Sequence, residues 1–246
     1  MTLKLNFTGS TDVGLIASTN KDAYYIDPEG RFFIVADGNG GYEGGDVVSG
    51  IAIQKIPTYL SEKWLSSRDS DKLLEFAFLT ANEAILQEQQ DRPELADMGT
   101  SVVVVIFRSP ESPICANVGN CRLYRWRESQ LEQITEDHTW VAKAIKAGDI
   151  TPEEARVHSF RHLVLSCLGR EEIASLKIQP VDLKVGDRLL LCSDGLTEGL
   201  TDQNIADYLQ QASTLEEAAS SLIAAAKEKG GKDNITVVLV DLLESD

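Results

Sequence analysis

Two segments of the 246-residue chain carry an aspartate in the same local pattern. They read RFFIVADG (31–38) and RLLLCSDG (188–195). An apolar run that ends in a small residue, aspartate and glycine is typical of a buried strand that presents a carboxylate at its tip. These two aspartates are Asp37 and Asp194. Asp233 directly precedes the apolar segment NITVVLVDL, and Asp22 precedes the aromatic segment AYYI, so four strand ends carry a carboxylate.

An aspartate at the end of a strand is commonly only a turn residue. The repeated pattern, with a third aspartate among glycines, favours a shared site instead. Carboxylates that converge at partly buried strand tips repel one another, and protonation or a bound cation relieves the repulsion. Hard oxygen ligands without histidine or cysteine select Mg²⁺ or Mn²⁺ over zinc. The sequence therefore predicts that Asp37, Asp194 and Asp233 surround divalent ions, with the Gly38 carbonyl as a further oxygen ligand.

The loop after Asp37 has five glycines in eight positions, a density that needs a physical reason because glycine is costly to order. It is not a phosphate-binding loop of the GxxxxGK[ST] type, since no Lys-Ser or Lys-Thr follows. The dinucleotide spacing GxGxxG also fails, because Glu43 stands where the third glycine is required. The loop therefore disfavours nucleotide binding and fits close approach of substrate to the ions.

Composition narrows the class of protein. With 43% hydrophobic and 25% charged residues and no linker-like segment, residues 1–246 are expected to form a single domain. A net charge of −16 disfavours nucleic acid and anionic membrane as partners. We expect a soluble cytoplasmic protein with no signal peptide and with buried, free cysteines at Cys115, Cys121, Cys167 and Cys192.

The order of elements predicts the fold class. Strands are expected at 31–36, 100–107, 114–118, 122–126, 130–134, 187–193 and 234–242. Helices are expected at 47–64, bent or ended near Pro57, at 73–90, and after Thr201 and Thr214. Residues 137–169 read as a polar helical insert, interpreted either as a mobile flap or as an ordinary surface helix pair. Because strict strand–helix alternation is missing, an α+β fold with largely antiparallel sheets and helices packed outside is predicted.

Seven motifs together resemble one known family. In chain order they are NKDAYYI, FFIVADGNGGYEGG, ADMGTS, NVGNCRLYRW, CLGREE, GDRLLLCSDGL and GGKDNITVV. This ordered set, from about Gly9 to about Leu242, resembles the metal-dependent PPM-type (type 2C) protein serine/threonine phosphatases, most closely the small single-domain bacterial members. The resemblance implies a four-layer αββα sandwich, in which two mainly antiparallel β-sheets are flanked by helix pairs and two Mn²⁺ or Mg²⁺ ions lie at one end.

The resemblance also implies roles for individual residues. Asp37 would bridge both ions, the Gly38 carbonyl would bind one, Asp194 and Asp233 would complete the other ion's shell, and Asp22 would hold a water bound to an ion. The implied reaction is hydrolysis of phosphoserine or phosphothreonine on a protein substrate by a water that the ions activate, without a covalent intermediate. No heptad pattern argues for a stable assembly, so a monomer is expected.

Four positions depart from the family pattern, and all are near the expected site: Ala17, Asn39, Tyr42 and Asn120. Ala17 stands where the family usually carries an arginine that grips substrate phosphate, and alanine offers no donor. Tyr42 replaces a histidine, and a phenol does not act as an acid near neutral pH. Asn120 replaces the aspartate that helps to bind a third, weaker ion, which makes that ion doubtful. Arg122 or Arg161 could bind phosphate in place of the missing arginine.

Three interpretations stay open at this point. In the first, the chain is a working phosphatase with reduced or narrowed activity, because the core of paired ions is intact. In the second, it is a degenerate phosphatase that binds metal and phosphoprotein and regulates by occupancy. In the third, it is a structural interaction domain without metals, which predicts that Mn²⁺ leaves its melting temperature unchanged.

Overall fold

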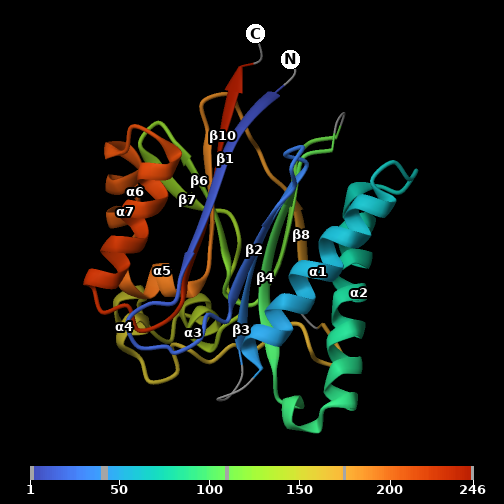
Figure 1. Ribbon diagram of the computed structural model, residues 1–246. Helices are drawn as coiled ribbons and strands as arrows, with labels where there is room; N and C mark the ends of the chain where they lie inside the picture. Colours follow the sequence, from blue (N-terminus) through green and yellow to red (C-terminus); the bar gives the residue numbers. More distant parts are fainter. Residues whose placement is uncertain (1–2, 40–43, 109–110, 174–175, 245–246) are drawn as a thin grey trace.

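The computed structural model describes residues 3–39, 44–108, 111–173 and 176–244. Within these ranges the chain forms two five-stranded antiparallel sheets that pack face to face, with helices on both outer faces (Figure 1). The order of layers is therefore helices, sheet, sheet, helices. This is the α+β architecture that the sequence predicts.

One sheet has the strand order β2-β3-β4-β5-β8. Its strands are β2 (Asp22–Ile26), β3 (Phe32–Asn39), β4 (Gly99–Ile106), β5 (Ile114–Val118) and β8 (Lys177–Pro180). The central strand β4 is buried at every position, because one of its faces packs on the second sheet and the other on helices. Val, Ile and Phe dominate the inner strands since β-branched and aromatic side chains fit a pleated surface that is covered on both sides.

The other sheet has the strand order β1-β10-β9-β6-β7. Its strands are β1 (Leu3–Asp12), β10 (Ile235–Glu244), β9 (Arg188–Cys192), β6 (Arg122–Arg127) and β7 (Gln130–Gln133). The β6–β7 hairpin turns at Glu128 and Ser129, whose φ values of 50° and 65° are left-handed. Two left-handed residues in a two-residue turn match the right-handed twist of the flanking strands. The strands predicted at 122–126 and 130–134 are thus joined as a hairpin.

Three apolar layers hold the sandwich together. Between the sheets, Phe33 and Val35 of β3 face Leu191 of β9 and Val238 of β10. Alternate residues of β3, such as Ile34, point outward and pack under helices. Because successive side chains of a strand face opposite sides, one buried strand serves two apolar layers and is fixed in position by both. The carboxylates at the strand ends are therefore carried on rigid supports.

Helices cover the two outer faces unequally. On the outer face of the first sheet, α1 (Gly45–Lys63) packs on β2, β3 and β4, and α2 (Ser70–Asp91) packs on α1 and reaches β5 and β8. A short 3₁₀ turn, η1 (Pro93–Leu95), follows α2. On the other face lie α5 (Asp194–Gly199), α6 (Asp202–Gln211) and α7 (Leu215–Glu228). The sequence left open whether the first helix bends or ends near Pro57; it does not end there, because α1 continues through this buried proline to Lys63.

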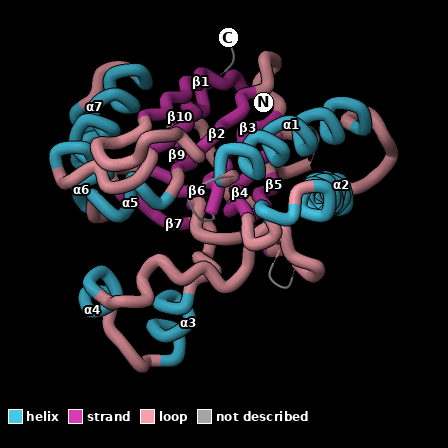
Figure 2. Tube along the Cα trace, turned by 60° about the horizontal axis from the view of Figure 1, so that its bottom comes forward, coloured by secondary structure: helices cyan, strands magenta, loops and turns pink. Residues whose placement is uncertain are grey.

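The segment predicted as a helical insert projects from one end of the sandwich (Figure 2). It contains α3 (Trp140–Ala147) and α4 (Pro152–Val157). Thr151 caps α4: its hydroxyl accepts from the Glu154 amide, and the Glu154 carboxylate accepts from the Thr151 amide. The insert is tied to the sheets at its base, where Leu168 bridges to Thr100 of β4. We call residues 137–169 the flap.

Candidate active site

Four aspartates gather at the end of the sandwich from which the flap projects. Asp22 and Asp37 lie directly opposite each other on the neighbouring strands β2 and β3. Asp194 opens α5 just after β9, and Asp233 lies just before β10, the strand that pairs with β9. Two of the aspartates therefore come from each sheet, and the structure brings together all four carboxylates that the sequence singles out.

The two Asp-Gly pairs are built in the same way. A Cβ atom on Gly38 would lie 1.9 Å from the carbonyl oxygen of Gly45, and one on Gly195 would lie 1.9 Å from the carbonyl oxygen of Asn234. No side chain fits at such distances, so only glycine lets these two backbones touch. Gly38 thus lets the start of α1 pack tightly beside Asp37. Gly195 likewise lets the end of the loop before β10 pack tightly beside Asp194.

Asp22 is buried and is held by hydroxyl groups from the opposite sheet. Its Oδ2 atom accepts hydrogen bonds from Ser193 Oγ at 2.6 Å and from Thr236 Oγ1 at 2.7 Å. Burial raises the pKa of Asp22 to about 7, although both hydroxyls favour the carboxylate. A positive charge placed beside Asp22 would therefore stabilise its ionised form.

The ionised forms of Asp37 and Asp194 are disfavoured even more strongly than that of Asp22. Burial raises the pKa of Asp37 well above its usual value, and the negative charges of Asp194, Asp22 and Asp233 raise it further. Burial also raises the pKa of Asp194, followed by the charges of Glu198 and Asp233. Such a donor set, all oxygen and all negative, fits hard divalent cations, which remove the repulsion that otherwise forces protonation.

Asn234 anchors a loop beside Asp233, a role that sequence inspection missed. Its side-chain amide donates to the carbonyls of Val13 and Thr19, and its Oδ1 atom accepts from the Lys21 backbone. The loop that carries Ala17 is thereby fastened next to the aspartate cluster. The signal for this anchor was present in GGKDN, where a polar residue directly precedes a mostly apolar strand.

The two arginines proposed for phosphate binding have different surroundings. Arg122 binds Asp137 through Nε and Nη2, with the shortest distance 2.6 Å, and donates from Nη1 to Tyr124 at 2.6 Å. Its guanidinium is thus committed to an ion pair at the base of the flap. Among the described residues, Arg161 makes one long side-chain hydrogen bond, 3.4 Å to the carbonyl of His158, and it lies on the flap side of the site.

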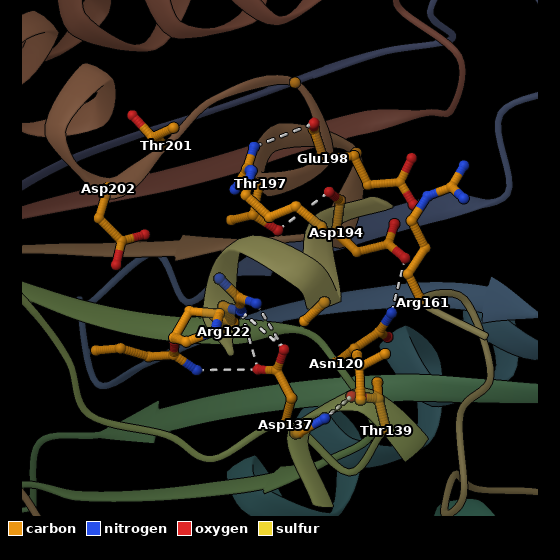
Figure 3. Close-up of a pocket in the computed structure, with 18 of the residues that line it drawn as sticks. Asn120, Arg122, Asp137, Thr139, Arg161, Asp194, Thr197, Glu198, Thr201 and Asp202 are labelled. Atoms are coloured by element: carbon orange, nitrogen blue, oxygen red, sulfur yellow. Dashed lines mark hydrogen bonds and ion pairs between the residues drawn. The ribbon is translucent and has the colours of Figure 1, made fainter. Parts of the chain in front are cut away.

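A cleft of about 1180 Å³ separates the flap from α5 and α6. Figure 3 shows Arg161, Asp194 and Glu198 at the same end of this cleft. Glu198 pairs with Nδ1 of His162 at 2.5 Å, so this flap histidine reaches the neighbourhood of Asp194. Ligand atoms of His162, Asp194 and Glu198 lie within 4.8 Å of one another, a grouping that the sequence did not predict.

Three of the four departures from the family pattern lie within the described residues. Asn39 and Asn120 are described, and both take part in side-chain hydrogen bonds next to Asp37 and Asp194. Ala17 is half-buried in the anchored loop. Tyr42 lies outside the described residues. All four cysteines are free and buried, as predicted, and no described helix is long and apolar enough to cross a membrane.

Comparison with known proteins agrees with this geometry. A family described as protein phosphatase 2C matches residues 17–232. The chain belongs to this family. It is 34% identical over 240 residues to the serine/threonine phosphatase stp of Listeria monocytogenes, covering 94% of this chain and 93% of that protein. It is also 34% identical to the serine/threonine protein phosphatase PstP of Mycobacterium tuberculosis, of which it spans only 46%.

Solved structures extend the similarity to the whole sandwich and to the metal. The catalytic domain of PstP in complex with two manganese ions matches this chain with a TM-score of 0.87 at 33% identity, covering 99% of this chain and 100% of that domain. Other structural neighbours are PPM Ser/Thr phosphatases. The fold and the family predicted from the sequence are thus confirmed, and a divalent metal is supported by this phosphatase 2C neighbour.

The pKa shifts predict how the stability of the metal-free phosphatase 2C domain depends on pH. A raised pKa means that the folded state binds the proton of Asp22 more tightly than the unfolded state does. The contribution of Asp22 to the free energy of unfolding is then full below about pH 4 and is lost as the pH rises through about 7. We expect the melting temperature in EDTA to fall over this range and Mn²⁺ to restore it, as differential scanning fluorimetry can measure.

The matched control for this prediction is Asp22→Asn, which keeps the shape and removes the titrating group. The fall in melting temperature should be smaller in this variant. A wild-type pH dependence retained by Asp22→Asn would show that the pKa of Asp22 is not raised in the metal-free protein.

Proposed function

We propose that this chain hydrolyses phosphoserine and phosphothreonine on proteins, using two Mn²⁺ or Mg²⁺ ions. The observation that carries the proposal is the convergence of four aspartates from two sheets beside the cleft, which Asp194 and Asp233 line, with the pKa values of Asp22, Asp37 and Asp194 all raised. Such a cluster is electrostatically unfavourable alone and becomes favourable around cations. We further propose that residues 1–246 act as a single domain and as a monomer.

Each residue has a proposed role. Asp37 would contribute to holding both ions, the Gly38 carbonyl to holding one of them, and Asp194 and Asp233 to holding the other. Asp22, fixed by Ser193 and Thr236, orients the attacking water from the floor of the site. The two ions, when bound, lower the pKa of a water molecule and neutralise the charge of the transferring phosphoryl group.

Arg161 is the better candidate for binding the phosphate group. The guanidinium of Arg122 already has a carboxylate partner in Asp137, so phosphate would have to break a partly buried ion pair. Arg161 lines the cleft with one weak side-chain contact and is free to turn toward a ligand anion. We therefore assign Arg122 to holding the base of the flap and Arg161 to gripping phosphate.

A lower rate than that of arginine-bearing relatives is proposed from Ala17. Ala17→Arg is expected to raise kcat/KM for a phosphopeptide by about 10-fold or more, because one preorganised charged donor contributes on the order of 10²-fold. The matched control is Ile16→Arg, which adds the same charge at the neighbouring exposed position. Equal rates for the two variants, measured with saturating Mn²⁺, would show that the missing arginine does not limit turnover.

The second candidate function is a regulatory module that binds metal and phosphoprotein without turnover. The alanine at position 17 and the asparagine at position 120 favour it, since both positions lack the usual charged group. Release of phosphate from a phosphothreonine peptide with titrated Mn²⁺ separates the two functions. Mn²⁺-dependent release supports the phosphatase. Phosphopeptide binding with no release above that of an Asp37→Asn variant would support the module.

A further inference from the structure

A directed chain of hydrogen bonds runs across the aspartate cluster from one sheet to the other. Asn39 Nδ2 donates to Ser101 Oγ at 3.1 Å, and Ser101 Oγ donates to Asn120 Oδ1 at 2.7 Å. Asn120 Nδ2 then donates to Asp194 Oδ2 at 2.7 Å. We call these side chains the Asn120 relay.

The backbone holds the Asn120 relay rigidly. Ser101 on β4 is fully buried and lies opposite Asp37 in the register of β3 and β4. Asn120 is 5% exposed and follows Gly119, whose φ is +94°. A Cβ on Gly119 would lie 2.2 Å from Ser101 Oγ, so only glycine lets this turn sit on Ser101. The side chain of Asn120 therefore has little freedom to turn away from Asp194.

The direction of the bonds determines what Asn120 can do. Its only acceptor, Oδ1, receives the Ser101 hydroxyl, so the group that faces Asp194 is an NH₂ donor. An NH₂ group does not ligate a cation. It occupies Oδ2 of Asp194 and leaves Oδ1 available for an ion, as outer-shell partners of metal ligands commonly do.

The balance of charge in the aspartate cluster also favours a neutral donor at position 120. Four aspartates, at positions 22, 37, 194 and 233, carry four negative charges when ionised, and two divalent ions carry four positive charges. The nearby Glu198 is paired with His162. A carboxylate in place of Asn120 would put a fifth negative charge 2.7 Å from Asp194, where a proton or a further cation would be needed.

We infer that Asn120 is a positioning residue that fixes Asp194 by hydrogen bonding and limits this site to two divalent ions. The neutral donor does the work that an additional cation beside Asp194 would otherwise do. The inference rests on the two-ion site of the proposed function, and it concerns the number of ions and the orientation of a ligand, not the reaction itself.

The test counts bound manganese without reference to activity. The full chain is dialysed against MnCl₂ from micromolar to millimolar concentration at mildly alkaline pH, and the bound metal is measured by mass spectrometry. The wild type is expected to saturate at two ions. Asn120→Asp is expected to take up a third ion with weaker affinity, because its carboxylate pair with Asp194 then needs a cation. Asn204→Asp, the same change in the capping position of α6, is the matched control and should bind two.

The positioning role is tested by removing the donor. Asn120→Ala should weaken Mn²⁺ binding about 10-fold, the lower end of what loss of an outer-shell partner costs. Asn120→Gln keeps an amide donor and should restore part of this loss, a rescue that a merely structural role would not produce. Near-ultraviolet circular dichroism verifies that each variant is folded.

The outcomes separate this inference from the proposed function. Three ions in the wild type, or only two in Asn120→Asp, would overturn the inference and leave the two-ion phosphatase standing. Wild-type affinity in Asn120→Ala would also overturn it. Absence of manganese binding in the wild type would overturn the proposed function together with the inference.

Discussion

Asp37→Asn is expected to lose Mn²⁺ binding and, with it, more than about 100-fold of the phosphatase activity. Changes in outer-shell partners already cost 10–100-fold, and Asp37 is proposed to bridge both ions directly. Because burial and three neighbouring aspartates raise the pKa of Asp37, its replacement also removes strain from the metal-free protein. The melting temperature in EDTA should therefore be unchanged or higher. Isothermal titration calorimetry and thermal melting measure the two effects.

The matched control is Asp207→Asn, which removes the same charge from an exposed position on α6. It should bind Mn²⁺ and hydrolyse substrate like the wild type. Loss of binding combined with a gain in metal-free stability would exclude misfolding as the cause. Unaltered Mn²⁺ affinity in Asp37→Asn would rule out Asp37 as an ion ligand.

Arg161→Ala is expected to lower kcat/KM for a phosphopeptide by about 100-fold, as removal of a single preorganised charge donor does. Inorganic phosphate should also inhibit the variant more weakly, because the same guanidinium would hold the product. Arg161→Lys should recover only part of the loss, since lysine keeps the charge without the paired N–H groups. Steady-state kinetics with phosphate as inhibitor measures both effects.

Lys143→Ala is the matched control, because it removes an exposed cation from the same flap without touching the cleft lining. Its kinetics should equal those of the wild type. If Arg161→Ala and Lys143→Ala behave alike, the phosphate is held elsewhere, and Arg122, released from Asp137 on substrate binding, becomes the residue to test.

Much of the fold could be predicted from local patterns. The apolar run ICANV coincides with β5, and the threonine caps place the starts of α4, α6 and α7. Strand β1 was missed, because its only strong signal is its pairing with β10 more than 200 residues later. The short β8 and the single-turn α5 were also missed, since four to six residues carry too little periodicity.

The residues of the site, like the elements of the fold, could be predicted only in part. Asp37 and Asp194 could be found because two strands end in one repeated pattern. The partners of the cleft could not, because they depend on how the flap docks: Arg122 reaches Asp137, and His162 reaches Glu198. The asparagine at position 120 looked like a lost charge in the sequence, whereas the fold places it as a donor to Asp194.

The most direct test of the central claim is an anomalous difference map from a crystal of this chain grown with abundant manganese. The account predicts two peaks in the cleft, with Asp37 between them and with Asp194 and Asp233 on one. Carboxylates that point apart around a site without anomalous density would contradict it, and the phosphatase proposal would then lose its physical basis.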